Sequence, residues 1–540
     1  MIEFTVPAGQ PDGGPLWSRT LLQPLAPGAL TPFSASLLAE NTRRAWYAYF
    51  YDRLGFAPAL RSPVVRDYQG RPYVNLSLSA ELDAQHAGLE PVAVRVNGIT
   101  RAVAPWEKPG LLAGIKLGRG AKKITDTLHA LAAELDATTR KAQTWLQRVQ
   151  EMRWSQAEIL QIMEEIERVG SATLLPYFAV RYNLESAYGR LLRRVTAVPF
   201  PRAVALVNQA LAGIDGLVEV EIARGVADLA AAALAEPPVL AYLHKGEFGE
   251  DPTRLPTGPF AAKLAIFLAT YGHRCADEGE IRNARWCEDP APLLRAVLAS
   301  AGTGAALPSL ADGSAAMPAL LAAVDGKQRK EAQLLVQQLR QWLPWQSRAL
   351  DAYAYVLAGT RRWAQAAAHE AMSDRRLLAP DDVFFYELEE MKEMMTGEWN
   401  VSDRSGIRAT AAGRKTDWQG FAQLVPGELL VGNAEATLTT HGLAGAAGQG
   451  QGAAATALGT AGPRGAKIVL VAVQPDAGWA GGLPSAAGLL AAQGSPLDPT
   501  MAAAAALRIP TVYALGQDWA SLADGQTILL DGDVGKVTLG

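Results

Sequence analysis

One short stretch concentrates polar residues that could do chemistry within an otherwise apolar region. It contains His273, Arg274, Glu278 and Glu280. A histidine beside an arginine and two carboxylates can hold one imidazole tautomer, accept a substrate proton and clamp an anion. The planar guanidinium of arginine suits phosphate because it donates two hydrogen bonds at once. The same residues could instead form a structural ion-pair network between helices, and both interpretations remain open from the residues alone.

Two other patterns resemble ligand sites without the residues that such sites need. His273, Cys275 and Cys287 fit no established zinc spacing and leave a fourth ligand missing, so we predict no metal site. The run from Gly448 to Gly452 alternates glycine with glutamine. It lacks the Lys-Ser/Thr of a phosphate loop and the third glycine of a dinucleotide motif.

Aromatic residues between positions 342 and 363 form a possible pocket lining. They could surround an aromatic or apolar substrate, although such residues in helical domains are most often core. The residues are Trp342, Trp345, Tyr353, Tyr355 and Trp363.

Length, composition and charge restrict the class of protein. A chain of 540 residues is expected to form two to four domains. The 49% hydrophobic and 19% charged content is typical of a globular protein, and the net charge of −4 gives no electrostatic footprint for nucleic acid. Two cysteines favour a reducing cytoplasm. We find no signal peptide at the N-terminus and no apolar stretch long enough to span a bilayer, so we expect a cytoplasmic protein without a membrane partner.

The elements that must position these residues change along the chain. Residues 1–115 are rich in Pro and Gly and predict loops, short strands and one helix near Leu37–Leu54. Helical periodicity then runs through 116–400. In this region we expect separate helices over 326–343 and 346–373, because Pro344 removes an amide donor between them.

The C-terminal part has a different texture. Residues 401–433 are polar and contain glycine, which favours a hinge or linker. From 434 to 540, short apolar strands alternate with small-residue helices, and this alternation predicts an α/β module. The fold class is therefore α plus α/β, with a large, mainly helical domain before the C-terminal module.

Four segments, in order along the chain, resemble one family. They are Trp17-Ser-Arg-Thr with Leu25–Ser34; Tyr271-Gly-His-Arg with Glu278-Gly-Glu-Ile281 and Arg285–Pro290; Asp381–Glu390; and Gln474–Trp479, Arg508-Ile-Pro510 and Asp524–Gly535. Together they resemble the phosphoenolpyruvate-utilising phosphotransferases of the rifampicin phosphotransferase and phenylphosphate synthase type. This resemblance implies a substrate domain followed by a swivelling β/β/α phosphohistidine domain, and it implies a strand and turn near Gly448.

The resemblance also exposes a missing residue. In such a family the swivelling domain carries a Ser-His pair at a helix start, and the histidine carries the phosphoryl group. Here Asp498 and Pro499 stand in the aligned positions, and proline cannot be phosphorylated. Asp498 suits a helix N-cap and Pro499 a first helical position. His441, at the start of the domain, is expected to be solvated rather than a substitute carrier. The loop is thus predicted to keep its fold as a degenerate carrier loop.

The resemblance implies partners as well. The sequence contains neither an ATP-grasp domain nor a phosphoenolpyruvate-binding barrel, as in the phenylphosphate-synthase type. We therefore expect no cofactor in this chain, with ATP and Mg on a separate ATP-grasp-type subunit, and a small organic hydroxyl compound as substrate. In that role His273, Arg274, Glu278 and Glu280 would face the substrate, and phosphoryl transfer would come directly from the partner's nucleotide. The alternative is a non-catalytic assembly or regulatory subunit, a pseudoenzyme that holds an active paralogue and the ATP-grasp chain together.

Overall fold

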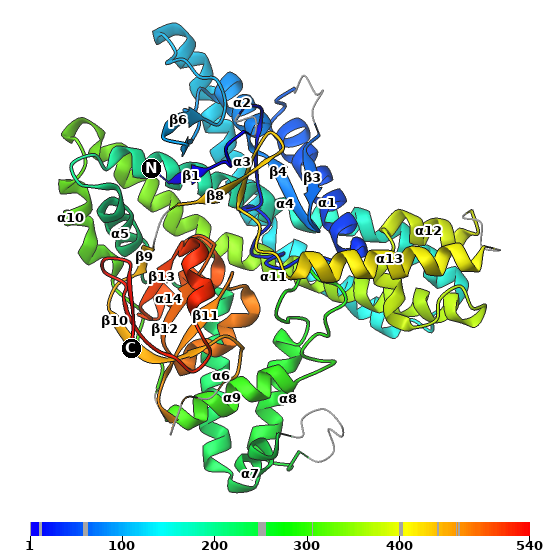
Figure 1. Ribbon diagram of the computed structural model, residues 1–540. Coiled ribbons are helices and arrows are strands. Elements are labelled where there is room, and N and C mark those ends of the chain that lie inside the picture. Colours follow the sequence, from blue (N-terminus) through cyan, green and yellow to red (C-terminus); the bar gives the residue numbers. More distant parts are fainter. Residues whose placement is uncertain are drawn as a thin grey trace.

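The computed structural model describes residues 2–9, 13–57, 63–246, 255–304, 306–398, 403–439, 442–460, 462 and 465–540. A mainly helical region occupies most of the chain, and a sheet-based domain follows it at the C-terminal end (Figure 1). The predicted fold class, α plus α/β, is therefore confirmed. The helices are α1 (Pro32–Tyr47), α2 (Leu76–Ala87), α3 (Leu111–Glu151), α4 (Gln156–Arg194), α5 (Phe200–Leu211), α6 (Val218–Ala235), α7 (Pro237–Lys245), α8 (Pro259–Tyr271), α9 (Ala291–Thr303), α10 (Met317–Ala322), α11 (Arg329–Ser373), α12 (Leu388–Thr396), α13 (Arg404–Ala422) and α14 (Pro499–Ala506).

Three long helices form the frame of the helical region. α3, α4 and α11 pack on one another along their lengths and bury apolar faces in one continuous core. The start of α4 is fixed by a capping box in which Ser155 and Glu158 satisfy each other's backbone amides. These helices carry side chains of the site described below, so their mutual packing sets its geometry.

The expected break at Pro344 does not occur. α11 runs without interruption from Arg329 to Ser373 with Pro344 inside it. Leu343, Gln346 and Ser347 on either side of the proline are buried. Burial of this face against neighbouring elements offsets the single lost backbone hydrogen bond, because most helical stability in proteins comes from tertiary packing.

An eight-stranded sheet brings the two ends of the helical region together. Its order is β3-β4-β2-β7-β8-β1-β5-β6. Its strands are β1 (Glu3–Thr5), β2 (Leu16–Ser18), β3 (Val65–Tyr68), β4 (Arg71–Asn75), β5 (Ala93–Val96), β6 (Ile99–Ala102), β7 (Leu429–Val431) and β8 (Ala434–Leu438).

The segment 401–433, expected to be a hinge, is largely ordered secondary structure where it is described. It contains α13 and the buried strand β7, which pairs antiparallel with β2 and β8. β8 in turn pairs with β1, so the strand just after position 434 belongs to the N-terminal sheet. Polar composition did not reveal this pairing, because the partner strands lie hundreds of residues away.

The C-terminal domain has a seven-stranded sheet in the order β15-β14-β10-β11-β12-β13-β9. β10 to β13 pair in parallel, and antiparallel strands flank them. The strands are β9 (Leu443–Ala446), β10 (Gln449–Ala455), β11 (Ile468–Ala472), β12 (Ala486–Ala491), β13 (Thr511–Tyr513), β14 (Thr527–Asp531) and β15 (Lys536–Leu539).

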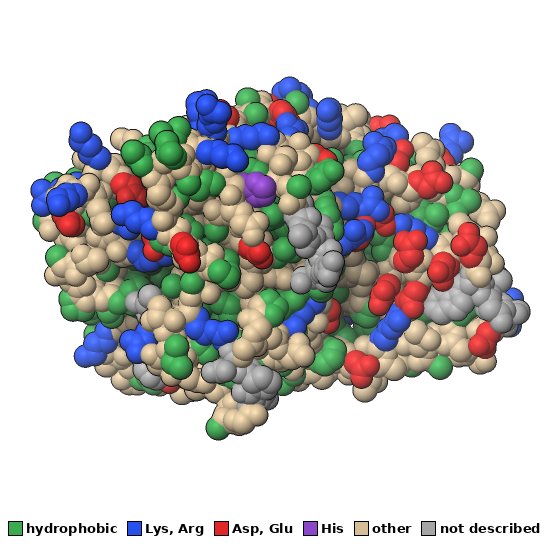
Figure 2. Space-filling view, turned by 90° about the horizontal axis from the view of Figure 1, so that it is seen from above, with side chains coloured by type: hydrophobic (Ala, Val, Ile, Leu, Met, Phe, Trp, Pro, Cys, Tyr) green, Lys and Arg blue, Asp and Glu red, His purple; other side chains and the backbone are tan. Residues whose placement is uncertain are grey.

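The C-terminal domain is docked on the helical region. The short helix α14 packs against α6, α11 and the 3₁₀ segment Ala477–Ser485 (Figure 1). Polar contacts reinforce the docking: the Gln346 side chain donates to the Leu497 carbonyl at 2.8 Å, and Asn208 donates to the Ala444 carbonyl at 2.7 Å. Figure 2 views the molecule from above relative to Figure 1. Basic and acidic side chains both occur over the face that it shows.

Candidate functional site

His273 lies just after α8, in a loop that folds back on itself. The Cys287 amide donates to the Gly272 carbonyl and the Trp286 amide donates to the Arg274 carbonyl, both at 2.9 Å. The imidazole Nε2 lies 3.1 Å from Oδ1 of Asp351 on α11, and the ring stacks on Tyr355 with centroids 3.5 Å apart. Among the described residues no partner contacts the other ring nitrogen, Nδ1. Asp351 therefore orients the ring, and Nδ1 is left to accept a proton.

Arg274 shares Asp351 Oδ1 with the His273 ring and lies within a network of acids. Its guanidinium pairs with Glu278, with Asp351 at 2.8 Å and with Glu219 at 3.5 Å. Arg274, Glu278 and Glu219 have no exposed side-chain surface, and Ser347 donates to Glu219 at 2.6 Å. Burial acts to raise the pKa of Asp351, but His273 and Arg274 outweigh it and lower that pKa to about 2. Arg274 is thus already neutralised by the protein and has no free edge for a substrate anion.

Glu280 is separated from the other predicted site residues. Its carboxylate accepts hydrogen bonds from the Thr31 amide at 2.7 Å, from the Thr31 and Ser34 hydroxyls at 2.9 Å, and from the Arg282 amide at 2.8 Å. These bonds tie the start of α1 to the loop after α8. The structure therefore brings His273, Arg274 and Glu278 together and gives Glu280 a structural position.

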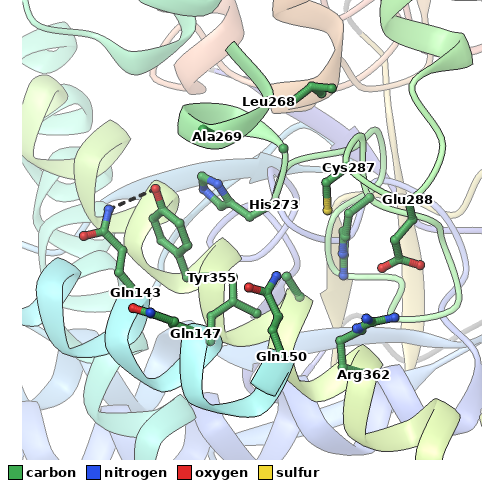
Figure 3. A pocket seen from close by; sticks show the side chains of 14 residues that line it. Gln143, Gln147, Gln150, Leu268, Ala269, His273, Cys287, Glu288, Tyr355 and Arg362 are labelled. Atoms are coloured by element: carbon green, nitrogen blue, oxygen red, sulfur yellow. Dashed lines mark hydrogen bonds between the residues drawn. The ribbon is translucent and has the colours of Figure 1, made fainter. Parts of the chain in front are cut away.

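A cavity of about 790 Å³ opens beside His273 (Figure 3). Gln143, Gln147 and Gln150 line it from one face of α3, and Gln143 donates to the Tyr355 hydroxyl at 3.0 Å. Leu146, Leu268 and Ala358 supply apolar wall. The polar remainder of the lining is Arg285, Cys287, Glu288 and Arg362. The volume suits a small organic molecule, and the mixture of wall types suits one with both apolar and polar parts.

Sequence reasoning found part of this site and missed the rest. Of the five aromatic residues considered for a pocket, only Tyr355 lines the cavity, while Trp342, Tyr353 and Trp363 are core. Asp351 and Glu219 were missed because they lie on other helices, far from His273 in sequence. The glutamines at 143, 147 and 150 were a detectable signal, because this spacing places them on one face of a helix.

The loop at Asp498 and Pro499, predicted to be a degenerate carrier loop, lies elsewhere, at the docked face of the C-terminal domain. Asp498 is the N-cap residue of α14 and Pro499 begins the helix, as predicted. The Asp498 side chain, however, caps no amide of that helix. Its carboxylate lies 2.7 Å from a guanidinium nitrogen of Arg181 on α4 and accepts hydrogen bonds from Gln474 at 2.6 Å and the Ser495 amide at 2.9 Å. A buried guanidinium is a stronger, charge-assisted partner than helix amides, and this explains the difference.

The helix end of this loop, Leu497–Pro499, is buried, whereas residues 494–496 are partly exposed. Asp498 has no exposed surface, and Arg181 also binds Glu185 and the Thr20 carbonyl. Gly494 takes a φ of +112°, and a Cβ there would come within 2.9 Å of Asp498 Oδ2, so the turn requires glycine. His441, which we considered as a substitute carrier, lies outside the described residues.

A pair of acids lies between this loop and the His273 loop. Asp476, at the start of the Ala477–Ser485 segment, accepts a hydrogen bond from the amide of Asp277. Burial and neighbouring carboxylates, chiefly Glu278, raise the pKa of Asp476 to about 7. Burial and Asp476 raise the pKa of Asp277 well above its usual range. These carboxyls therefore hold protons at pH values where exposed acids have lost them.

Metal-binding clusters and membrane-spanning helices bear on the class of site. Among the described residues, no group of three or more His, Cys, Asp or Glu side chains could hold a metal ion. Within the same residues, no single helix is long and apolar enough to cross a membrane, and α6 with α7 pass that test only as a pair bent by 112°.

Comparison with known proteins places both parts of the chain. The model of the rifampicin phosphotransferase fourth domain matches residues 174–356, which include the His273 loop and Asp351. The model of the mobile domain of PEP-utilising enzymes matches residues 465–535, which include Asp498 and Pro499. No match was found among curated proteins. The two matches support a likeness to PEP-utilising, rifampicin-phosphotransferase-like proteins, and the family resemblance in the sequence is thereby confirmed.

Proposed function

We propose that the chain is a carrier-deficient subunit of an ATP-dependent phosphotransferase. In this proposal it binds a small organic hydroxyl compound, and a separate ATP-grasp subunit supplies ATP and Mg. The observation that carries the proposal is the state of the carrier loop. Pro499 stands where a phosphohistidine would be, and Asp498 beside it is buried in an ion pair with Arg181. A mobile domain docked in this way has neither the carrier nor free access to a distant ATP site.

The His273 cavity supports the substrate part of the proposal. Asp351 holds Nε2, so Nδ1 can take the proton of a bound hydroxyl as its oxygen attacks phosphorus. The new O–P bond forms as the bond between the γ-phosphorus of ATP and its leaving oxygen breaks, and ADP departs with the partner. The catalytic role of His273 is part of this proposal, while Arg274 and Glu278 act by holding Asp351 and the loop.

One observation favours the alternative, an assembly or regulatory subunit. Arg274 is fully engaged with Glu278, Asp351 and Glu219 within the protein. Such self-contained networks can serve structure alone. Under this alternative the chain would hold an active paralogue and the ATP-grasp chain together without touching substrate.

The test uses the complex of the chain with its ATP-grasp partner, obtained by co-expression with neighbouring genes. ATP consumption is measured with a series of phenols and alcohols. We expect turnover to require this chain and to fall at least tenfold in His273→Gln, because a general base typically contributes 10²–10⁴-fold. His369→Gln, an exposed histidine on α11, is the matched control and should keep full activity.

Two results would overturn parts of the proposal. Turnover that needs the chain but is unchanged in a folded His273→Gln variant would establish the assembly role instead. A phosphorylated residue between 490 and 505, found by mass spectrometry after incubation with ATP, would show that the loop still carries phosphate.

A further inference from the structure

Arg285 lines the His273 cavity with an incompletely bonded guanidinium. Its side chain is 1% exposed. Nη1 donates to Cys275 Sγ at 2.6 Å and to the Glu278 carbonyl at 3.1 Å. Nε and Nη2 are buried and have no hydrogen-bond partner. Arg285 therefore belongs to the cavity wall and has two buried donors without a hydrogen-bond partner in the described structure.

The two free nitrogens have a particular geometry. Nε and Nη2 lie on one edge of the planar guanidinium, the edge that binds a carboxylate or phosphate through two parallel hydrogen bonds. A buried donor without a partner is unfavourable, and more so when it is charged. An oxyanion bound at this edge would remove that penalty.

The protein supplies no anion of its own at this edge. Among the described residues no carboxylate forms an ion pair with Arg285, and the nearby Glu278 side chain pairs with Arg274. Glu288 on the cavity wall pairs with Arg361 at 2.9 Å. The positive charge of Arg285 is therefore not cancelled by direct contact.

A second guanidinium strengthens the positive character of the cavity. Arg362 on α11 is exposed and lines the same cavity, on the side of Glu288 (Figure 3). No ion pair joins it to a carboxylate of the described chain. His273 lies between Gly272 and Arg274, whose carbonyls accept from the amides of Cys287 and Trp286, so base and guanidinium are on adjoining stretches of backbone.

We propose that Arg285, assisted by Arg362, forms an oxyanion-binding subsite in the His273 cavity. The ligand group is a compact oxyanion, either the carboxylate of a hydroxy acid or the phosphoryl group that is transferred to a hydroxyl. The subsite itself stands on the free edge of Arg285, whereas this account of its ligand rests on the proposed function. With a substrate carboxylate as the ligand, the subsite narrows the substrate class from any small hydroxyl compound to hydroxy acids. With the phosphoryl group as the ligand, the subsite holds the group that the substrate hydroxyl receives beside the base.

The binding test uses the whole chain and isothermal titration with three probes. These are inorganic phosphate, 4-hydroxybenzoate and the neutral compound phenol. We expect at least one anion to bind, and its affinity to fall at least tenfold in Arg362→Gln and in Arg285→Lys, which keeps the charge but loses the fork. Arg348→Gln, which removes a surface cation paired with Asp136 outside the cavity, is the control and should bind normally.

The probes also separate the two sources of the oxyanion. Binding of phosphate without hydroxybenzoate assigns the subsite to the transferred group, and binding of hydroxybenzoate without phosphate assigns it to a substrate carboxylate. Mutual competition between the two shows one shared subsite. Because Arg285 is buried and its replacement by Lys could perturb folding, thermal unfolding is recorded for each variant. Arg362 is exposed, so the anion affinity of Arg362→Gln tests the subsite without a change in the core.

The outcomes distinguish this proposal from the proposed function. No anion binding, or binding unaffected by either arginine variant, overturns the subsite even if the complex phosphorylates neutral phenols. Arginine-dependent anion binding by a chain whose complex shows no hydroxyl-dependent ATP consumption supports the subsite and overturns the phosphotransferase role.

Discussion

Two buried ion clusters of this protein use the same residue types and differ in what they leave open. At Asp351 a carboxylate accepts from Arg274 and His273, and His273 is part of the wall of a cavity. At Asp498 a carboxylate forms an ion pair with Arg181 and accepts hydrogen bonds from Gln474 and a backbone amide, and the Asp498 side chain has no exposed surface. The first arrangement can act on a ligand and the second can only hold two domains together. Position relative to a cavity, rather than residue type, separates a candidate site from a structural ion pair.

The largest expected effect comes from breaking the sealed cluster. Arg181→Met leaves Asp498 and Glu185 without their cation, and removing one partner of a buried pair typically destabilises by about 3–5 kcal/mol. Urea denaturation of the purified chain measures this change. Arg348→Gln breaks a surface pair with Asp136 and should change stability by less than about 1 kcal/mol. Equal effects of the two variants would show that the Arg181–Asp498 pair is not a buried structural contact.

A smaller effect is expected at the open cluster. Asp351→Asn removes a charged acceptor from Arg274 and His273, while Glu278 and Glu219 still face Arg274. We expect a loss of about 2 kcal/mol, the scale of hydrogen bonds to charged groups.

Asp351→Asn should also change how the stability of the folded chain depends on pH in the acidic range. The pKa of Asp351 is about 2 in the folded chain, below its value in an unfolded chain. Its contribution to stability is therefore present above about pH 4 and is lost as the pH falls towards 2. Denaturation at a series of acidic pH values should show this loss in the unmodified chain and less of it in Asp351→Asn. A variant that loses stability as steeply as the unmodified chain would contradict the assignment.

These two clusters also show how far sequence reasoning reached. The strands of the C-terminal domain and the helix start at Asp498-Pro499 were predictable, because glycine, proline and short apolar runs act locally. The continuous helix through Pro344 and the pairing of β7 with β2 were not predictable, because both depend on packing against distant segments. His273 was identified by its neighbours in sequence, whereas Asp351 and the Arg181 partner of Asp498 belong to other helices.

The acids between the clusters predict a dependence on pH near neutrality. Burial raises the folded-state pKa of Asp476 to about 7, above its unfolded value, so the folded state holds this proton more tightly. Its contribution to stability is therefore complete at low pH and is lost as the pH rises from about 4 to about 7. Asp277, Glu278 and Arg274 are the charged neighbours of this group.

Asp476→Asn isolates this dependence, because amide and protonated acid are both neutral. Relative to the unmodified chain, the variant should gain stability between about pH 5 and pH 8, by an amount of the order of 1–2 kcal/mol. Denaturation curves of Asp476→Asn and of the unmodified chain, recorded at pH 5 and at pH 8, measure this difference. A constant difference across the range would show that Asp476 titrates as an exposed acid does.

The smallest effect is expected at Pro499, the position at which we propose that a carrier histidine is replaced. Pro499 begins α14, and Pro499→Ala should change stability by less than about 1 kcal/mol, mainly through the unfolded chain. Thermal unfolding of the variant measures it. A much larger loss would mean that the proline ring itself, rather than Asp498, holds the loop in place.

Hydrogen exchange of α14, followed by mass spectrometry, tests the central claim most directly. The claim is that the carrier loop is docked and sealed while the His273 cavity stays open. We expect the amides of Ala502–Ala506 in the unmodified chain to exchange as slowly as those in the core of α11. Asp498→Asn should accelerate exchange in α14 and leave α11 unchanged. Rapid exchange of α14 in the unmodified chain, at the rate of exposed loops, would show a domain that swings freely and would contradict the account.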